Sequence, residues 1–203
     1  MNNKLIVLEG SDGIGKSTQV KIISKMFNAQ QIIQPSDDNC LWFLRDEVKN
    51  NEKHKPFERQ LLHTCSHIVD AFSKLKNISG IQNYILDRSH ASAYVYGSLQ
   101  KMESYQIDLI MEIHKNVYNE VLNNFDVEIV FLDKDCRYDP KETDKFEESI
   151  DWNKLRAYYN NFYNYLKTSK EYLFLPKERI HQIKVDDLSV EQVTNEICKA
   201  IVT

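Results

Sequence analysis

Residues 10–18 could bind the phosphates of a nucleoside triphosphate. Their sequence, GSDGIGKST, fits the phosphate-loop pattern GxxxxGK[ST]. In such a loop, glycines let the backbone turn tightly and direct N–H groups at phosphate oxygens, and the N-terminus of the following helix adds partial positive charge. The residues expected to contact the triphosphate are Gly10, Ser11, Gly13, Ile14, Gly15, Lys16, Ser17 and Thr18.

Two side chains of this loop have specific roles in this interpretation. Lys16 would reach the terminal phosphates, and the Ser17 hydroxyl would bind the accompanying Mg²⁺. An ordinary glycine turn is the alternative. The flanking segments favour the nucleotide site, because residues 4–8 form an apolar run typical of a buried strand and residues 17–28 follow with helical spacing.

Composition indicates one soluble globular domain over residues 1–203, with 42% hydrophobic and 28% charged residues. No apolar run approaches membrane-spanning length, and the N-terminus leads directly into the first strand, so we expect a cytoplasmic protein without membrane contact. A net charge of −4 argues against a broad nucleic-acid surface and favours small anionic partners. The four cysteines are widely spaced and form no CxxC pair, so we expect reduced thiols.

Strand-like and helix-like segments alternate along the chain, which predicts an α/β fold with a parallel sheet covered by helices on both faces. The predicted strands are Lys4–Leu8, Gln31–Gln34, Tyr84–Leu86, Glu128–Leu132 and His181–Val185. The predicted helices are Ser17–Asn28, Leu41–Asn50, Phe57–Asn77, Ser89–Leu99, Tyr105–Asn123, Asp151–Lys170 and one that starts at Ser189.

Each candidate functional segment follows one of these strands. The phosphate loop follows the first strand, Pro35–Ser36 the second, Asp87–Arg88 the third, and the polar segment 134–148, which has no periodicity and reads as a mobile loop, the fourth. Because the carboxyl ends of parallel strands meet at one edge of a sheet, we expect these segments to surround a single ligand site.

At residues 9–19 the sequence EGSDGIGKSTQ resembles the thymidylate kinase family, whose pattern is EGxDGxGK[ST]TQ. Gln34–Ser36 with Arg45 resembles the family's EP[GS] turn and following helix arginine. Leu86–Arg88 with Ser92 and Tyr96 resembles its DRYxxSxxAYQ segment. The resemblance covers essentially the whole chain. It implies a P-loop NTPase fold with strand order 2-3-1-4-5 and a lid loop at about residues 134–148.

The resemblance implies ATP- and Mg²⁺-dependent phosphorylation of a deoxynucleoside monophosphate, most simply dTMP, by a homodimer. Asp87 would hold Mg²⁺ through water. The acceptor site would contain Asp12, Pro35, Ser36, Arg45, His63, His67, Arg88, Ser92 and Tyr96, with Arg45 and Arg88 on the phosphate because a guanidinium binds phosphate bidentately. Gly13 stands where some members carry a catalytic arginine, so Arg137, Lys141 and Lys145 in the lid would supply that charge. Lys16, Asp12, Arg88 and Arg137 would act in catalysis.

The acceptor-base segment departs from the family pattern. Leu61–His67, LLHTCSH, stands where the family usually has LLFAADR, with an aromatic ring on thymine and an arginine reaching its carbonyl. Asp87–Ser89 is also similar to the [DE]RS of deoxynucleoside kinases. A deoxynucleoside kinase and an inactive kinase-like nucleotide-binding protein are therefore the alternative functions.

Individual residues have alternative interpretations as well. Arg88 could be a structural ion-pair partner, Arg45 a surface residue, and the lid cations part of a solvated loop. His63 and His67 lie one helical turn apart, but no third ligand with recognisable spacing supports a metal site. Tyr96 could stack on the acceptor sugar or fill the core.

Overall fold

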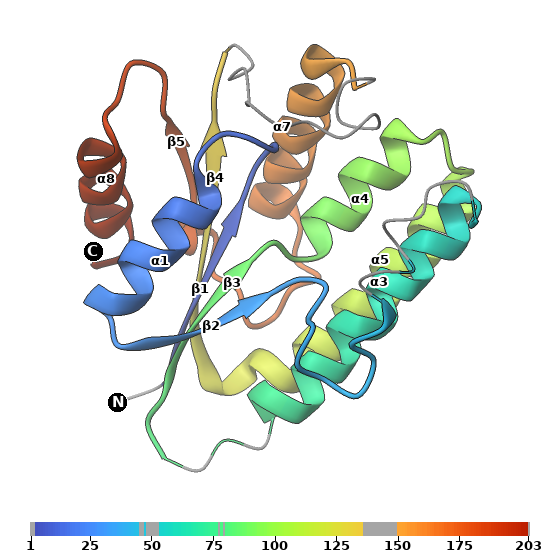
Figure 1. The fold of residues 1–203 in the computed structure, drawn as a ribbon, viewed down its shortest axis with the longest axis horizontal. Coiled ribbons are helices and arrows are strands. Elements are labelled where there is room, and N and C mark those ends of the chain that lie inside the picture. The colour runs from blue at the N-terminus through green and yellow to red at the C-terminus, as the bar shows by residue number, and fades with distance from the viewer. Residues whose placement is uncertain are drawn as a thin grey trace.

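The structure is a computed structural model that describes residues 3–44, 47, 53–76, 78, 80–135 and 150–202. Its centre is a five-stranded parallel sheet in the order β2-β3-β1-β4-β5, as expected (Figure 1). The strands are β1 (Asn3–Glu9), β2 (Ala29–Ile33), β3 (Asn83–Asp87), β4 (Phe125–Asp133) and β5 (Ile180–Lys184).

The central strands are buried on both faces, which explains their continuous apolar runs. Leu5, Ile6 and Leu8 of β1 are fully buried, and β1 pairs in parallel with β3 on one side and β4 on the other. β2 differs, because it is an edge strand with exposed glutamines and begins two residues before the predicted strand. Its weak apolar signal could not define its start.

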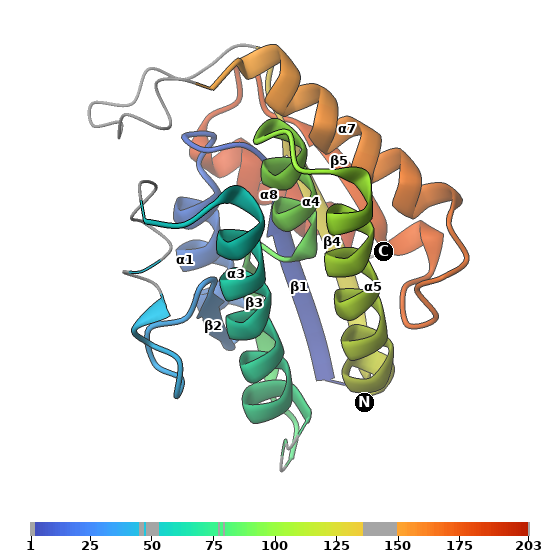
Figure 2. The same ribbon diagram turned by 90° about the vertical axis from the view of Figure 1, so that its right-hand side faces the viewer.

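Helices cover the two faces of the sheet in separate groups (Figures 1 and 2). One face packs against α1 (Lys16–Met26) and α8 (Val190–Val202), which contribute Val20, Ile23 and Ile197 to a hydrophobic cluster. The other face carries the remaining long helices, α3 (Pro56–Asp70), α4 (His90–Leu99), α5 (Ser104–Val121) and α7 (Trp152–Thr168).

The predicted helix over 57–77 is two elements. An α-helix, α3, ends at Asp70 and continues as the π-helix η1 (Ala71–Lys76). Apolar periodicity locates a helical face but does not separate these two hydrogen-bonding patterns. Half of the predicted helix at 41–50 and most of the predicted lid lie outside the described residues.

The remaining elements are short 3₁₀ turns at Leu122–Asn124 (η2) and Lys177–Arg179 (η3). Cys40, Cys65 and Cys198 are free thiols, as expected, whereas Cys136 lies outside the described residues. Of the helices that the structure describes, none is long and apolar enough to span a membrane.

Candidate active site at the phosphate loop

The phosphate loop joins β1 to α1 in a conformation that requires glycine. Gly10 has φ +136°, and a Cβ built on it would lie 2.5 Å from the Leu132 carbonyl oxygen of β4. Gly13 and Gly15 also have positive φ, and Gly15 directly precedes the first turn of α1. The loop backbone therefore curves closely over the end of β4 and leads into the helix N-terminus, where N–H groups and the helix dipole favour phosphate.

Lys16 and Ser17 occupy the first turn of α1. The Lys16 ammonium is buried, donates to the Ser11 carbonyl oxygen at 2.6 Å and lies 4.0 Å from Asp12 Oδ1. The Ser17 hydroxyl donates to Oδ2 of Asp87 at 2.9 Å, from the end of the neighbouring strand β3. A hydroxyl and a carboxylate side by side are oxygen ligands of the kind that Mg²⁺ prefers, so this pair fits that ion.

Arg88 lies over the loop at the point where β3 turns into α4. It has a left-handed φ of +79°, and its backbone N–H donates to the Leu8 carbonyl at 3.1 Å. Its guanidinium is ion-paired with Asp12, and the Tyr96 hydroxyl donates to the other oxygen of that carboxylate. Residues from the loop, the β3 end and α4 thus converge on Asp12.

Glu9, the last residue of β1, contacts two residues that lie next to Arg88, namely Ser89 and Ser92. Its carboxylate is fully buried and accepts the Ser89 backbone N–H, the Ser89 hydroxyl at 2.7 Å and the Ser92 hydroxyl at 3.0 Å. Burial raises the pKa of Glu9, while the hydrogen bond from Ser89 and the charge of Arg88 act in the opposite direction. The start of α4 is therefore bound directly to β1.

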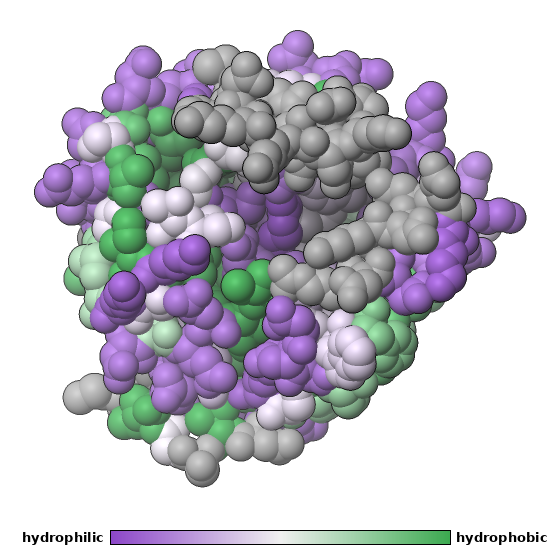
Figure 3. Space-filling view, viewed as in Figure 1, coloured by the Kyte–Doolittle hydropathy of each residue, from purple (hydrophilic) through white to green (hydrophobic). Residues whose placement is uncertain are grey.

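The surface is hollowed beside this cluster. Figure 3 shows a depression between the phosphate loop and α4, with a hydrophilic floor. Tyr96 is partly exposed and Asp12 has a third of its side chain exposed, so both can contact a ligand bound beside the phosphate loop. The site also holds two cations, Lys16 and Arg88, which suit the phosphates of a nucleotide.

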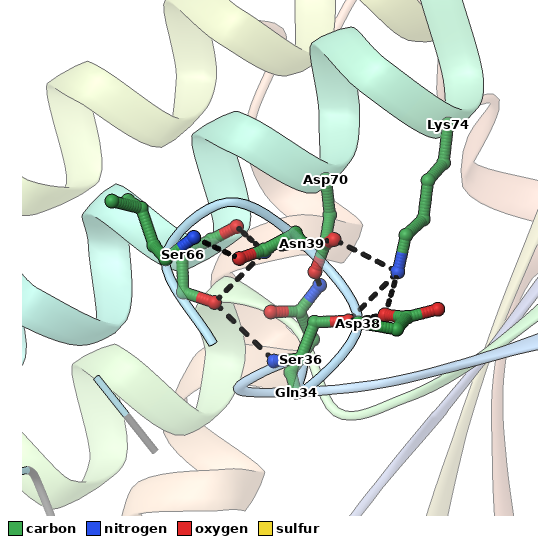
Figure 4. A network of polar contacts seen from close by, with 8 residues as sticks. Gln34, Ser36, Asp38, Asn39, Ser66, Asp70 and Lys74 are labelled. Atoms are coloured by element: carbon green, nitrogen blue, oxygen red, sulfur yellow. Dashed lines mark hydrogen bonds and ion pairs between the residues drawn. The ribbon is translucent and has the colours of Figure 1, made fainter. Parts of the chain in front are cut away.

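A second polar network holds the segment after β2 against α3 (Figure 4). Asp70 is buried and accepts from Gln34 Nε2 at 2.8 Å, Asn39 Nδ2 at 3.0 Å and Lys74 Nζ at 3.0 Å. The Ser36 hydroxyl accepts from Lys74 at 2.7 Å, and its backbone N–H donates to Ser66 Oγ at 3.3 Å. The predicted acceptor segment Pro35–Ser36 is thus fixed in position, with the Ser36 side chain engaged by protein groups.

The two predicted base-contacting histidines belong to a cluster with His90 and His114, in which His63 is half-buried and the other three are buried. His114 Nδ1 lies 2.9 Å from the Ile110 carbonyl oxygen, which only accepts, so this nitrogen carries the proton. Burial lowers the pKa of His114 to about 4, so the ring is neutral and Nε2 is an acceptor.

That acceptor fixes the tautomer of His67. His67 Nδ1 lies 3.0 Å from His114 Nε2 and must donate to it. Burial also holds the pKa of His67 well below its usual value, so the ring is neutral and His67 Nε2 carries no proton. Within the described chain, no group of three or more His, Cys, Asp or Glu residues could hold a metal.

The structure therefore brings together the predicted residues of the loop, of the β3 end and of α4. Arg45, Arg137, Lys141 and Lys145 lie outside the described residues. Four further residues contact the predicted ones, although no functional role was predicted for them: Glu9 of β1, Ser89 at the start of α4, Tyr159 of α7 and His114 of α5. Glu9 and Ser89 were part of quoted motifs, but Tyr159 and His114 had no signal beyond apolar periodicity.

A phosphate loop on a 2-3-1-4-5 parallel sheet, with an arginine at the end of β3 facing the loop, defines a P-loop kinase class of protein. The pattern of the thymidylate kinase family matches residues 8–197. A probable thymidylate kinase from Methanococcus aeolicus is 32% identical over 98% of this chain and 96% of its own length. The chain therefore belongs to the thymidylate kinase family.

Solved structures share the fold. Thymidylate kinase from Ehrlichia chaffeensis has a TM-score of 0.70 at 16% identity, covering 99% of this chain and 100% of that one. Deoxyadenosine kinase from M. mycoides with bound dATP has a TM-score of 0.60 at 20% identity, covering 98% of this chain and 100% of that one. At these identities the similarity concerns the fold alone.

Proposed function

We propose that this protein transfers the γ-phosphoryl group of ATP to dTMP, giving dTDP and ADP. The observation that carries the proposal is the cluster of Asp12, Arg88 and Tyr96 beside the phosphate loop in a chain of the thymidylate kinase family. Phosphoryl transfer needs positioning and positive counter-charge rather than a covalent intermediate, and this cluster adjoins the loop that would hold the donor.

The donor phosphates would lie in the loop between Gly10 and Thr18. Lys16 would leave the Ser11 carbonyl and reach the terminal phosphates. The backbone N–H groups of the loop would donate hydrogen bonds to the other phosphate oxygens. Ser17 and Asp87 would hold Mg²⁺, which neutralises phosphate charge when bound. We also propose that Arg137, Lys141 and Lys145 of the predicted lid supply positive charge to the transferring phosphoryl group.

The acceptor phosphate would bind Arg88, whose planar fork suits two phosphate oxygens, with Arg45 as a proposed second contact. Asp12 would then exchange part of its pairing with Arg88 for the acceptor sugar, beside Tyr96. The Pro35–Ser36 segment, fixed to α3 through Asp70, would line the far side of the acceptor.

The acceptor base would lie against His63 and His67 on α3. Since His67 Nε2 is an acceptor, the base must offer a hydrogen there, and thymine has one at N3. N3-methyl-dTMP keeps the phosphate and sugar but lacks this hydrogen. We expect its kcat/KM to fall at least about thirtyfold below that of dTMP, as for a loss of about 2 kcal/mol. Equal values for the two nucleotides would reject the base contact while leaving the kinase proposal intact.

The main test uses purified protein with ATP, Mg²⁺ and either dTMP or thymidine. We expect ADP formation that depends on dTMP, and a loss of at least about a hundredfold in Lys16→Ala, because the lysine supplies transition-state charge. Phosphorylation of thymidine but not of dTMP would favour the deoxynucleoside kinase alternative. Nucleotide binding without transfer to either acceptor would favour the inactive kinase-like protein. We also propose that the protein is cytoplasmic and forms a homodimer. Sedimentation analysis would test the oligomeric state.

A further inference from the structure

The two oxygens of Glu9 have different partners, and the difference connects this residue to Arg88. Oε1 accepts two hydrogen bonds from Ser89, one from the backbone N–H and one from the hydroxyl at 2.7 Å. Oε2 accepts one, from the Ser92 hydroxyl at 3.0 Å. Burial raises the pKa of Glu9, but these three donors and the nearby charge of Arg88 oppose that shift and favour the ionised carboxylate, in which both oxygens are acceptors.

The Ser92 hydroxyl has one hydrogen and two lone pairs. Because the hydrogen is directed at Glu9, the lone pairs face Arg88 NH1 at 3.2 Å and the Tyr159 hydroxyl at 3.2 Å. The Tyr159 oxygen also accepts from Arg88 NH1, at 3.3 Å. Burial raises the pKa of Tyr159 to about 12, so this phenol keeps its hydrogen and can donate it to Ser92. Both hydrogens of Arg88 NH1 and the hydroxyl hydrogens of Ser92 and Tyr159 then have acceptors.

We propose that Glu9 is a positioning residue that sets the direction of the Ser92 hydroxyl and thereby holds the Arg88 guanidinium in place for the acceptor phosphate. The inference rests on the proposed function in one respect, which is that Arg88 binds the acceptor. Glu9 contacts no substrate in this account and acts through Ser92.

Glu9→Gln tests this directly, because glutamine has the same shape with one oxygen and one amide nitrogen. The two donors of Ser89 favour keeping the oxygen at the Oε1 position, so the amide N–H₂ faces Ser92 and donates to it. The Ser92 hydrogen must then turn toward Tyr159 or Arg88. If it points at Tyr159, the Tyr159 hydrogen loses its acceptor, and if it points at Arg88, it opposes a hydrogen of NH1. Either orientation disturbs the contacts that hold the Arg88 guanidinium, although the side chain at position 9 keeps its shape.

The experiment is a double-mutant cycle with Glu9→Gln, Ser92→Ala and the pair, measured by steady-state kinetics with dTMP and ATP. We expect each single variant to lower kcat/KM for dTMP about tenfold and to leave KM for ATP within about twofold. The double variant should be no more than about threefold worse than either single variant, because both disturb the same contact between Ser92 and Arg88.

Ser89→Ala is the matched control. It removes a hydroxyl that bonds to the same carboxylate but does not contact Arg88, so we expect a lower Tm and unchanged kinetics. Wild-type kinetics in Glu9→Gln, multiplicative losses in the double variant, or an equal loss in Ser89→Ala would each overturn the role of Glu9.

The same double-mutant cycle can be measured without turnover, by determining the affinity for dTMP by calorimetry. A wild-type protein that binds dTMP with the same non-additive cycle but does not phosphorylate it would reject the kinase activity and support the role of Glu9. A protein that neither binds nor phosphorylates dTMP would reject both proposals.

Discussion

Arg88 shows how much a single residue depends on its surroundings in this protein. Its left-handed backbone directs the side chain back over the phosphate loop, where Asp12 binds NH2 and both Ser92 and Tyr159 accept from NH1. A residue in this conformation persists only where its neighbours over-determine it. Arg88 does form an ion pair, with Asp12, as one interpretation of the sequence predicted. Since Asp12 belongs to the phosphate loop, this ion pair also places the guanidinium beside the loop.

We expect Arg88→Lys to lower kcat/KM for dTMP about a hundredfold, because an ammonium cannot make the three contacts of a planar fork. KM for ATP should change by less than about threefold. Arg179→Lys is the matched control, since Arg179 pairs with Asp126 at 3.0 Å at the opposite end of β4 and should keep wild-type kinetics. Equal kinetics of Arg88→Lys and the wild type would show that Arg88 does not bind the acceptor.

Motif spacing identified Lys16, Ser17, Asp87 and Arg88 from the sequence, because a phosphate loop and a strand-end carboxylate need fixed residue types. It could not identify Tyr159 or His114, which reach the site across tertiary contacts from helices that read as core. A tyrosine or histidine on an apolar helix face has the same sequence signal whether its polar atom has a functional partner or not.

At the scale of elements, Asp70 connects three segments. It binds Gln34 after β2, Asn39 in the following loop and Lys74 in η1, and only 2% of its side chain is exposed (Figure 4). The proposed acceptor segment Pro35–Ser36 therefore depends on a carboxylate in α3. Removing that carboxylate deprives Gln34 Nε2 of its acceptor, and Asn39 and Lys74 of one acceptor each.

We expect Asp70→Ala to lower the free energy of unfolding by about 3–5 kcal/mol, the usual cost of breaking a buried charge network, and to raise KM for dTMP. Denaturant unfolding and steady-state kinetics check the two effects. Glu120→Ala is the control, because it removes an exposed pair with Lys76 and should cost less than about 1 kcal/mol. A cost for Asp70→Ala no larger than for the control would contradict this account of the network.

The sequence predicted all five strands and the helices that the structure describes, because apolar runs and helical spacing report burial directly. It missed the transition from α3 to η1 and the start of β2. The Asp70 network could not be predicted from the sequence either, because the pairing of residues 34 and 39 with residue 70 depends on where the loop after β2 packs.

At the scale of the whole molecule, most of the histidines lie in one cluster. Four of its six histidines lie together between α3, α4 and α5, and burial lowers the pKa of each, to about 4 for His63 and His114. The folded protein therefore takes up these protons at lower pH than the unfolded chain. Stability from these groups is present above pH 6.5 and is lost as pH falls toward 4.

We expect the free energy of unfolding to decrease as pH falls from about 6.5 to 4.5. The slope should be shallower in His90→Phe, by up to about 1.4 kcal/mol per pH unit, because this variant removes one buried titrating ring from an aromatic environment. Urea unfolding at a series of pH values measures both slopes. Parallel curves for the two proteins would show that His90 titrates alike in the folded and unfolded states.

The strand order was predicted from the family resemblance alone. The periodicity of the sequence predicts a parallel sheet but does not say which strands are neighbours. The order 2-3-1-4-5 matters for function, since it places the β3 end beside the phosphate loop after β1 and so brings Asp87 to Ser17 and Arg88 to Asp12.

The proposed reaction is tested by transfer of labelled phosphate from [γ-³²P]ATP in the presence of Mg²⁺ and dTMP. We expect the label in the β-phosphate of dTDP, with one ADP formed for each dTDP, and neither product when dTMP is replaced by thymidine. Label in free phosphate alone, or in dTMP made from thymidine with none in dTDP, would contradict it.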